Sequence, residues 1–124
     1  MGEAFSIRGT DFEATVDFSV APQLRLVGSA DAAALAPLEQ VVDKLHAELV
    51  ASAKPECSID LVGLEFMNAT CFKIFVGWLG RIQELAPERR YRIVFRSNPA
   101  RAWQTRSLRT LSCFATELVG IEDG

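Results

Sequence analysis

The segment from Leu61 to Phe72 holds the side chain best placed for chemistry in this chain. An apolar run at 61–64 leads into a short polar turn, and an apolar pattern with helical spacing begins directly after it. Thr70 therefore falls at the expected N-terminus of a helix, where backbone N–H groups and the helix dipole favour negative charge. A hydroxyl in that position can accept a phosphoryl group and tolerate its charge. The segment predicts a binding module whose binding is switched, not an enzyme.

The other reactive side chains have no partners in the sequence. His46 is the only histidine, and it lies beside the apolar stripe of a predicted helix without a second ligand or catalytic group. Cys57, Cys71 and Cys113 form no C-x-x-C pair, which argues against a zinc site or a disulfide scaffold and for a reducing, cytoplasmic setting. Cys71 at a helix N-terminus leaves a reactive thiol with a lowered pKa as a minor alternative. We expect no metal site and no cofactor.

Length and composition predict a single globular domain. The chain has 124 residues, of which 49% are hydrophobic, and a net charge of −3. Its longest apolar runs stop well short of the ~20 residues that cross a bilayer, and its N-terminus shows no secretory signal. We therefore expect no membrane insertion.

Charge is unevenly distributed along the chain. Residues 1–70 hold 4 Lys and Arg against 11 Asp and Glu, whereas residues 71–124 hold 9 against 5. Seven of the basic residues are arginines between Arg89 and Arg109. They fit the solvated faces of a strand and a helix, and an acidic protein or a phosphate group is the alternative partner. Nucleic acid is not expected, because the domain is net acidic and no aromatic stacking motif lies among the arginines.

Hydrophobic periodicity predicts strands and helices in alternation after two initial strands. We expect an edge strand or hairpin arm over 4–20, a strand over 24–28 closed by glycine, a helix over 37–52, a strand over 57–62 buried on both faces, a helix over 69–85, a strand over 91–95, a helix over 99–112 and a short strand or docked tail over 116–121. Asp60 interrupts one strand and is expected to cap loop amides at the strand end. His46 is expected at the boundary of the core.

The predicted helix over 69–85 has two different faces. The residues expected to face the core are Phe72, Phe75, Val76, Leu79, Ile82 and Leu85; those on the opposite face are Lys73, Gly77, Gly80 and Glu84. Glycines inside a helix cost about 1 kcal/mol each relative to alanine. Gly77 and Gly80 therefore predict close packing by another element of the domain, and a docking partner flanked by Ile74 and Trp78 is the alternative.

These landmarks together resemble the STAS domain, the fold of bacterial anti-sigma-factor antagonists. The segment 28–31 resembles the family's glycine-x-x-aspartate turn, and 58–61 followed by 66–72 resembles its strand with an internal aspartate and the turn after that strand. The segments 97–99 and 111–114 resemble its last strand-to-helix passage and its closing leucine-rich turn. The resemblance implies an α/β fold with a small, mostly parallel mixed sheet and helices packed against it. It implies one domain over 1–124, with a core at 24–121 and an N-terminal strand extension at 1–20.

The resemblance also implies a role for the turn. Thr70 falls on the position that family antagonists phosphorylate. Asn68 replaces an aspartate and is still able to cap the helix, Ala69 replaces the first hydroxyl residue, and Cys71 replaces a glycine and adds a side chain to the docking surface.

The function that the resemblance implies is that of a bacterial, cytoplasmic regulator of transcription that binds an anti-sigma-factor-like serine/threonine kinase. The expected contact residues are Asp31, Phe72, Lys73, Ile74, Gly77 and Trp78. Phosphorylation of Thr70 would weaken docking without unfolding the module. A non-phosphorylated STAS subunit of a larger assembly, such as a lipid-transport ATPase complex, is the second hypothesis. An enzyme using His46 or Cys71 is the third, and the sequence does not specify the oligomeric state.

Overall fold

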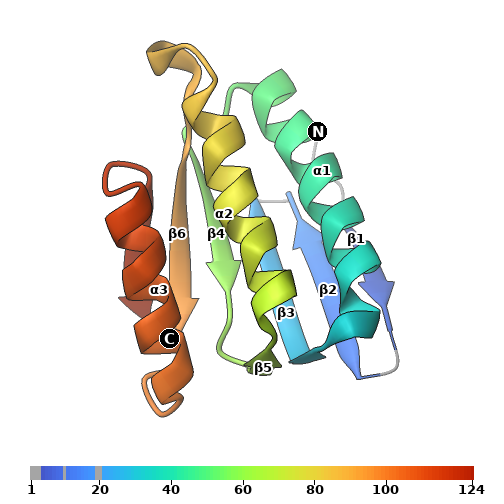
Figure 1. Cartoon of the computed structure of the whole chain (residues 1–124). Coiled ribbons are helices and arrows are strands. Elements are labelled where there is room, and N and C mark those ends of the chain that lie inside the picture. Colours follow the sequence, from blue (N-terminus) through green and yellow to red (C-terminus); the bar gives the residue numbers. More distant parts are fainter. Residues whose placement is uncertain (1–3, 10, 19–20) are drawn as a thin grey trace.

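A computed structural model describes residues 4–9, 11–18 and 21–124 of the chain. In this part of the chain, three α-helices lie against one face of a seven-stranded sheet (Figure 1). The elements are β1 (Ala4–Arg8), β2 (Phe12–Asp17), β3 (Gln23–Ala30), the 3₁₀-helix η1 (Ala32–Ala34), α1 (Leu35–Ser52), β4 (Glu56–Asp60), β5 (Leu64–Met67), α2 (Ala69–Gln83), the 3₁₀-helix η2 (Pro87–Arg89), β6 (Arg92–Ser97), α3 (Ala102–Phe114) and β7 (Val119–Asp123).

The sheet is mixed and mostly parallel, as predicted. Its strand order is β1-β2-β3-β4-β6-β7, and β5 pairs with β3 beyond the end of β4. The pairs β1–β2 and β2–β3 are antiparallel, whereas the pairs made by β4, β5, β6 and β7 are parallel. The N-terminal segment forms the hairpin β1–β2. Val20, the predicted end of the first strand, lies outside the described residues.

The core lies between the sheet and the helices. The predicted apolar stripe of α1 is buried throughout: Leu38, Val41, Val42, Leu45 and Leu49. The predicted strand over 91–95 is also present as β6, in which Ile93, Val94 and Phe95 are buried while Arg92 and Arg96 are exposed. Periodicity therefore placed these two elements correctly.

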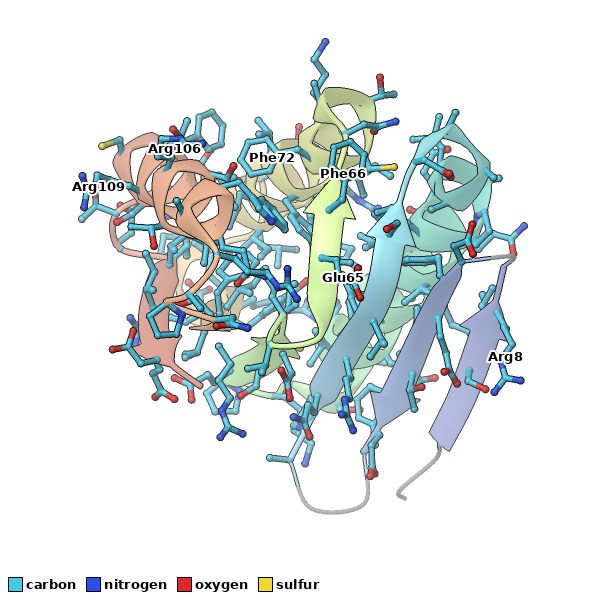
Figure 2. All side chains as sticks on the ribbon, turned by 90° about the horizontal axis from the view of Figure 1, so that it is seen from below. Arg8, Glu65, Phe66, Phe72, Arg106 and Arg109 are labelled. Atoms are coloured by element: carbon cyan, nitrogen blue, oxygen red, sulfur yellow. The ribbon has the colours of Figure 1, made fainter. Side chains whose placement is uncertain are left out.

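In the described part of the chain, the second face of the sheet carries no helix (Figures 1 and 2). In β4, Cys57 and Ile59 are fully buried, but Ser58 and Asp60 on the other face are partly exposed. The prediction that this strand is buried on both faces is therefore wrong. All three helices cover the same face, so a parallel strand in this sheet needs only one apolar side.

Gly28 does not close β3, contrary to the prediction. The strand runs on to Ala30, and the register with β5 shifts between Gly28 and Ser29. Gly28 has φ of 98°, and a Cβ there would lie 2.1 Å from the carbonyl oxygen of Asp11. Gly28 thus forms a bulge inside the strand and lets the segment at Asp11 approach its backbone closely. Only glycine accommodates both the positive φ and this contact.

The third helix begins at Ala102, not at Pro99 as predicted. Before it, Oδ1 of Asn98 accepts from the backbone N–H of Ala100 at 3.0 Å, which makes a separate turn. The backbone N–H of Asn98 itself donates to Oε1 of Gln104 at 2.8 Å. The segment after β6 is therefore held in a turn by a side chain of α3.

Candidate functional site

Two chain segments far apart in sequence meet at one end of the sheet. Ala30 pairs with Met67, and the backbone N–H of Asn68 donates to the carbonyl of Ala30 at 2.9 Å. The turn at Asp31 and the turn at Asn68 therefore lie side by side. Asp31 is exposed, and its Oδ1 accepts from the backbone N–H of Ala33 at 3.0 Å, which caps η1.

The start of α2 is capped as predicted. Oδ1 of Asn68 accepts from the backbone N–H of Cys71 at 2.8 Å, and α2 begins at the next residue, Ala69. Thr70 is the second residue of the helix, and its side chain is exposed. Among the described residues none forms a hydrogen bond with the Thr70 hydroxyl. The hydroxyl thus faces water within the first turn, where the helix dipole is positive.

Cys71 is buried, which corrects two expectations. Its side chain is 0% exposed and its Sγ donates to the backbone carbonyl of Asp31 at 3.3 Å. Burial raises the pKa of the Cys71 thiol and the nearby Asp31 raises it further, so the helix N-terminus does not produce a reactive thiolate. Nor does Cys71 add a side chain to the surface of the turn, because it is buried in the core.

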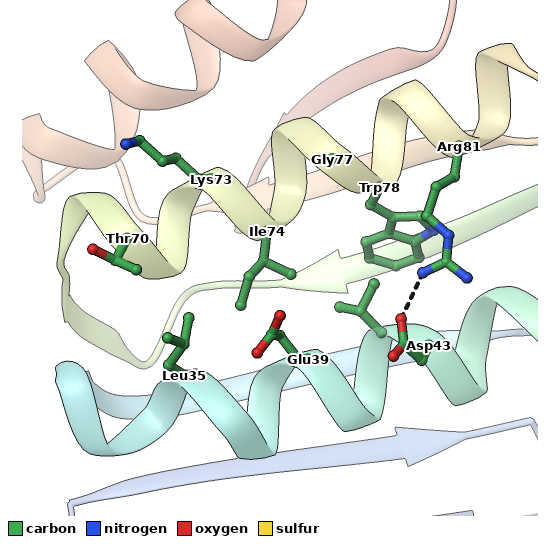
Figure 3. Close-up of a pocket in the computed structure, with 10 residues that line it drawn as sticks. Leu35, Glu39, Asp43, Thr70, Lys73, Ile74, Gly77, Trp78 and Arg81 are labelled. Carbon is green, nitrogen blue, oxygen red and sulfur yellow. Dashed lines mark hydrogen bonds and ion pairs between the residues drawn. The ribbon is translucent and has the colours of Figure 1, made fainter.

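A groove runs between α1 and α2 from Thr70 to the ion pair of Arg81 with Asp43 (Figure 3). Its volume is about 380 Å³. The residues that line it are Leu35, Glu39, Val42, Asp43, Thr70, Lys73, Ile74, Gly77, Trp78 and Arg81. Five of the predicted site residues thus line one groove: Thr70, Lys73, Ile74, Gly77 and Trp78.

Trp78 was predicted as an apolar contact flanking this surface; it lines the groove, but almost all of its side chain is buried. The side chain is 1% exposed, and its Nε1 donates to the hydroxyl of Tyr91 at 2.6 Å. Because indole can only donate, the Tyr91 hydroxyl is free to donate in turn to Nδ1 of His46, which lies 2.6 Å away. Trp78 therefore forms the floor of the groove and anchors α2 to α1 and to the start of β6.

The hydrogen bonds around Tyr91 determine the state of His46. Since Nδ1 accepts, the neutral imidazole carries its proton on Nε2. Burial lowers the pKa of His46, the positive charge of Arg81 lowers it further, and Asp43 opposes them. Burial also raises the pKa of Tyr91, so its hydroxyl keeps its proton. His46 is half-buried at the edge of the core, as predicted.

The glycines of α2 are not explained by packing inside the domain. A Cβ built on Gly77 or on Gly80 would have nothing within 4 Å beyond the helix itself. The prediction of close packing by another element of the domain is therefore wrong at both positions. Gly77 is exposed and lines the groove, whereas Gly80 is partly exposed and lies outside it.

Phe72 lies apart from the groove. Figure 2 shows it on the side of α2 toward α3, where it is partly buried and contacts Phe75 edge-on at 6.5 Å between ring centroids.

Sequence reasoning missed Phe66, a β5 side chain that is 49% exposed. The register shift at Gly28 places Phe66 opposite Ser29, and the two-residue alternation that would have buried it is broken there.

Side-chain hydrogen bonds from α3 hold residues 61–65, which precede the turn at Asn68, and sequence reasoning also missed them. Gln104 is 0% exposed, and its Nε2 donates to the carbonyls of Leu61 and Leu64 at 2.8 and 2.9 Å. Trp103 adds a bond from Nε1 to the carbonyl of Glu65 at 3.0 Å. The spacing of Gln104 with Leu108 and Leu111 is that of one buried helix face, which was the available signal.

Asp60 acts at this end of the sheet as predicted. Its Oδ1 accepts from the backbone N–H of Val62 at 2.9 Å, so Asp60 caps the loop after β4. In the described part of the chain, no group of three or more His, Cys, Asp or Glu side chains is arranged to hold a metal ion. No helix there is both long enough and apolar enough to cross a membrane.

Comparison with known proteins adds one finding on the fold. Neither the protein-family models nor the curated proteins give a match to the sequence. Among solved structures, one match is the crystal structure of an anti-sigma factor antagonist from Mycobacterium paratuberculosis, with a TM-score of 0.62 and 19% identity over 95% of this chain and 92% of that chain. The two chains share a fold, and the predicted STAS-like arrangement is confirmed at that level.

Proposed function

We propose that the chain is a regulatory protein-interaction module of the anti-sigma-factor-antagonist type, one domain with a core at 24–121, whose binding is switched by phosphorylation of Thr70. The observation that carries the proposal is the exposed Thr70 hydroxyl, which has no hydrogen-bond partner among the described residues and lies in the first turn of α2. The fold shared with an anti-sigma factor antagonist supports the same function.

The local electrostatics support phosphorylation as a switch rather than as a cause of unfolding. A phosphate adds about −1.5 to −2 charges. The positive end of α2 and Lys73, one turn further along the helix, would stabilise that charge within this chain. A partner surface shaped for a neutral hydroxyl would instead be repelled and would desolvate the phosphate. Phosphorylation would therefore weaken binding while leaving the fold intact.

The contact surface in this proposal is the first half of α2 together with the adjoining Asp31 turn. These segments are joined by the backbone bond from Asn68 to Ala30 and by the bond from Cys71 Sγ to Asp31. The partner is a serine/threonine kinase of the anti-sigma type, which would supply ATP and the catalytic groups. The chain itself would then act without metal or cofactor, in the cytoplasm of a bacterium, on transcription.

Phosphate mapping tests the proposal directly. The purified chain is incubated with ATP and a candidate kinase of the anti-sigma type, and the modified residue is located by mass spectrometry. We expect modification of Thr70, and its loss in Thr70→Ala. Thr105→Ala is the matched control, because Thr105 is also an exposed threonine in the first turns of a helix. Modification at another residue, or none with the cognate kinase, would refute the switch.

Binding by two variants separates the switch from a constitutive role. If Thr70 is a switch, Thr70→Ala keeps partner affinity and Thr70→Asp loses it. If the chain is a non-phosphorylated subunit of a larger assembly, such as a lipid-transport ATPase complex, the two variants bind alike. The presence of Ala69 in the turn, in place of a hydroxyl residue, favours this second function.

A further inference from the structure

We infer that the groove between α1 and α2 binds an amphipathic helix of the protein partner. This partner helix would carry acidic residues along its edge that faces α2 and basic residues along its edge that faces α1. The inference rests on the proposed function and goes beyond it by naming the element that binds and its orientation of charge.

The floor of the groove is apolar. Leu35 from α1 and Ile74 from α2 are partly exposed there, and Val42 and Trp78 also line the groove but are almost fully buried (Figure 3). Recognition of a helix in a groove depends on such a floor, into which the partner inserts apolar side chains spaced at i, i+3 or i+4 and i+7. From Thr70 to Arg81 the groove follows α2 for eleven residues, or roughly 17 Å at 1.5 Å per residue. That length fits about three turns of a bound helix.

The two rims of the groove carry opposite charges. The rim on α1 is acidic, with Glu39 and Asp43, and the rim on α2 is basic, with Lys73 and Arg81. Asp43 and Arg81 pair with each other at 2.6 Å at one end. Glu39 and Lys73 form no ion pair with any described residue. A partner helix with basic residues toward the acidic α1 rim and acidic residues toward the basic α2 rim would pair with both rims. The same helix bound with its two edges exchanged would be repelled by both rims.

Gly77 lets a partner approach closely. It lies on the α2 side of the groove, is exposed, and a Cβ there would contact nothing in the chain. A helical glycine with no packing role destabilises the free chain relative to alanine, and packed helices come within 8–10 Å of each other at small residues. The missing side chain is therefore useful to a bound helix and not to this domain.

The position of Thr70 links the groove to the switch. Thr70 and Lys73 lie at the end of the groove away from the Arg81–Asp43 pair (Figure 3). A phosphate on Thr70 would face the acidic edge of the bound helix and would compete with that edge for Lys73. Binding along the groove thus explains how a charge at one end displaces the partner.

Two glycine variants test the inference with a matched control. Gly77→Ala and Gly80→Ala both replace a helical glycine that has open space around its Cβ direction, but only Gly77 lines the groove. Both should raise Tm by a few degrees. By calorimetric titration with the kinase of the mapping experiment, Gly77→Ala should bind about tenfold more weakly, whereas Gly80→Ala should bind as the unmodified chain does.

Charge reversal and hydrogen exchange test the identity of the occupant. Glu39→Lys should weaken binding, while Glu48→Lys, an exposed α1 acid outside the groove, should not. In the complex, the segment of the kinase that gains protection should be a helix with apolar residues at i, i+3 or i+4 and i+7. Protection of an extended segment, or self-association of this chain through the same groove without kinase, would overturn the inference.

The outcomes separate this inference from the proposed function. If the kinase modifies Thr70 and binds, but Gly77→Ala and Gly80→Ala bind it equally, the groove is not the binding site for a partner helix. Phosphorylation of Thr70 as a switch then remains supported. If the kinase neither binds nor modifies the chain, the proposed function fails. If Gly77→Ala alone loses affinity while its Tm rises, the inference is supported, because a merely structural role for Gly77 would change both variants alike.

Discussion

The two ends of α2 are built in opposite ways. The C-terminal end is the sealed end: Trp78 is buried and is linked through the Tyr91 hydroxyl to His46, and Arg81 pairs with Asp43 on α1. The N-terminal end is the open end: backbone and capping hydrogen bonds hold the helix from beneath, while the hydroxyl of Thr70 faces water.

One helix thus combines a buried, hydrogen-bonded end with an end whose side chain at Thr70 is exposed. The bonds that position Thr70 come from residues that do not share its surface, such as Asn68 and the buried Cys71 and Gln104. A charge added at Thr70 can therefore change what binds there without disturbing the bonds that hold the helix.

The largest expected effect is at the sealed end. Tyr91→Phe removes the oxygen shared by Trp78 and His46 and leaves the Trp78 indole N–H buried without a partner. We expect a loss of about 2 kcal/mol in the free energy of unfolding, measured by urea denaturation. Thr105→Ala, at an exposed site, should change it by less than about 0.5 kcal/mol. Equal values for the two variants would contradict the anchoring role of Tyr91.

The open end should respond more weakly. Asn68→Ala removes the cap on the N–H of Cys71 and should cost about 1 kcal/mol. Asn68→Asp keeps the cap and adds a charge that the helix dipole favours, so its stability should equal or exceed that of the unmodified chain. Hydrogen exchange should show Asn68→Ala loosening the first turn of α2 while the turn around Trp78 stays protected. Uniform loosening along α2 would show that its two ends are not independent.

The smallest effect expected is a pH dependence at the sealed end. The folded state lowers the pKa of His46, so as pH falls below the ordinary value of about 6.5 the unfolded chain takes up a proton before the folded chain does. His46 therefore contributes stability above that pH, and the contribution is lost as pH falls toward the folded-state pKa. The free energy of unfolding should fall less steeply in His46→Gln than in the unmodified chain. Parallel pH profiles would contradict the lowered pKa.

The sequence was sufficient where one residue type had one available role. The stripe of α1 and the caps at Asn68 and Asp60 were predicted correctly, because helical spacing and short polar side chains at turns leave few alternatives. Fold class followed from the order of the elements.

The sequence was insufficient where two patterns compete. Apolar residues surround most of α2, so spacing alone did not decide whether Trp78 or Val76 lies deepest, and the structure buries Trp78. Gly28 marks a bulge because the carbonyl of Asp11, just before the neighbouring strand β2, lies against it. Gln104 is buried because the carbonyls of Leu61 and Leu64 after β4 accept its side-chain hydrogen bonds. Such contacts between distant segments leave no local pattern.

The central claim is that charge at Thr70 controls docking and leaves the fold unchanged. The most direct test is the Kd of the cognate kinase for this chain before and after stoichiometric phosphorylation of Thr70, with Tm measured on both forms. We expect phosphorylation to weaken binding roughly tenfold or more and to leave Tm unchanged or slightly higher. An unchanged Kd, or a loss of binding that accompanies a collapse of Tm, would contradict the claim.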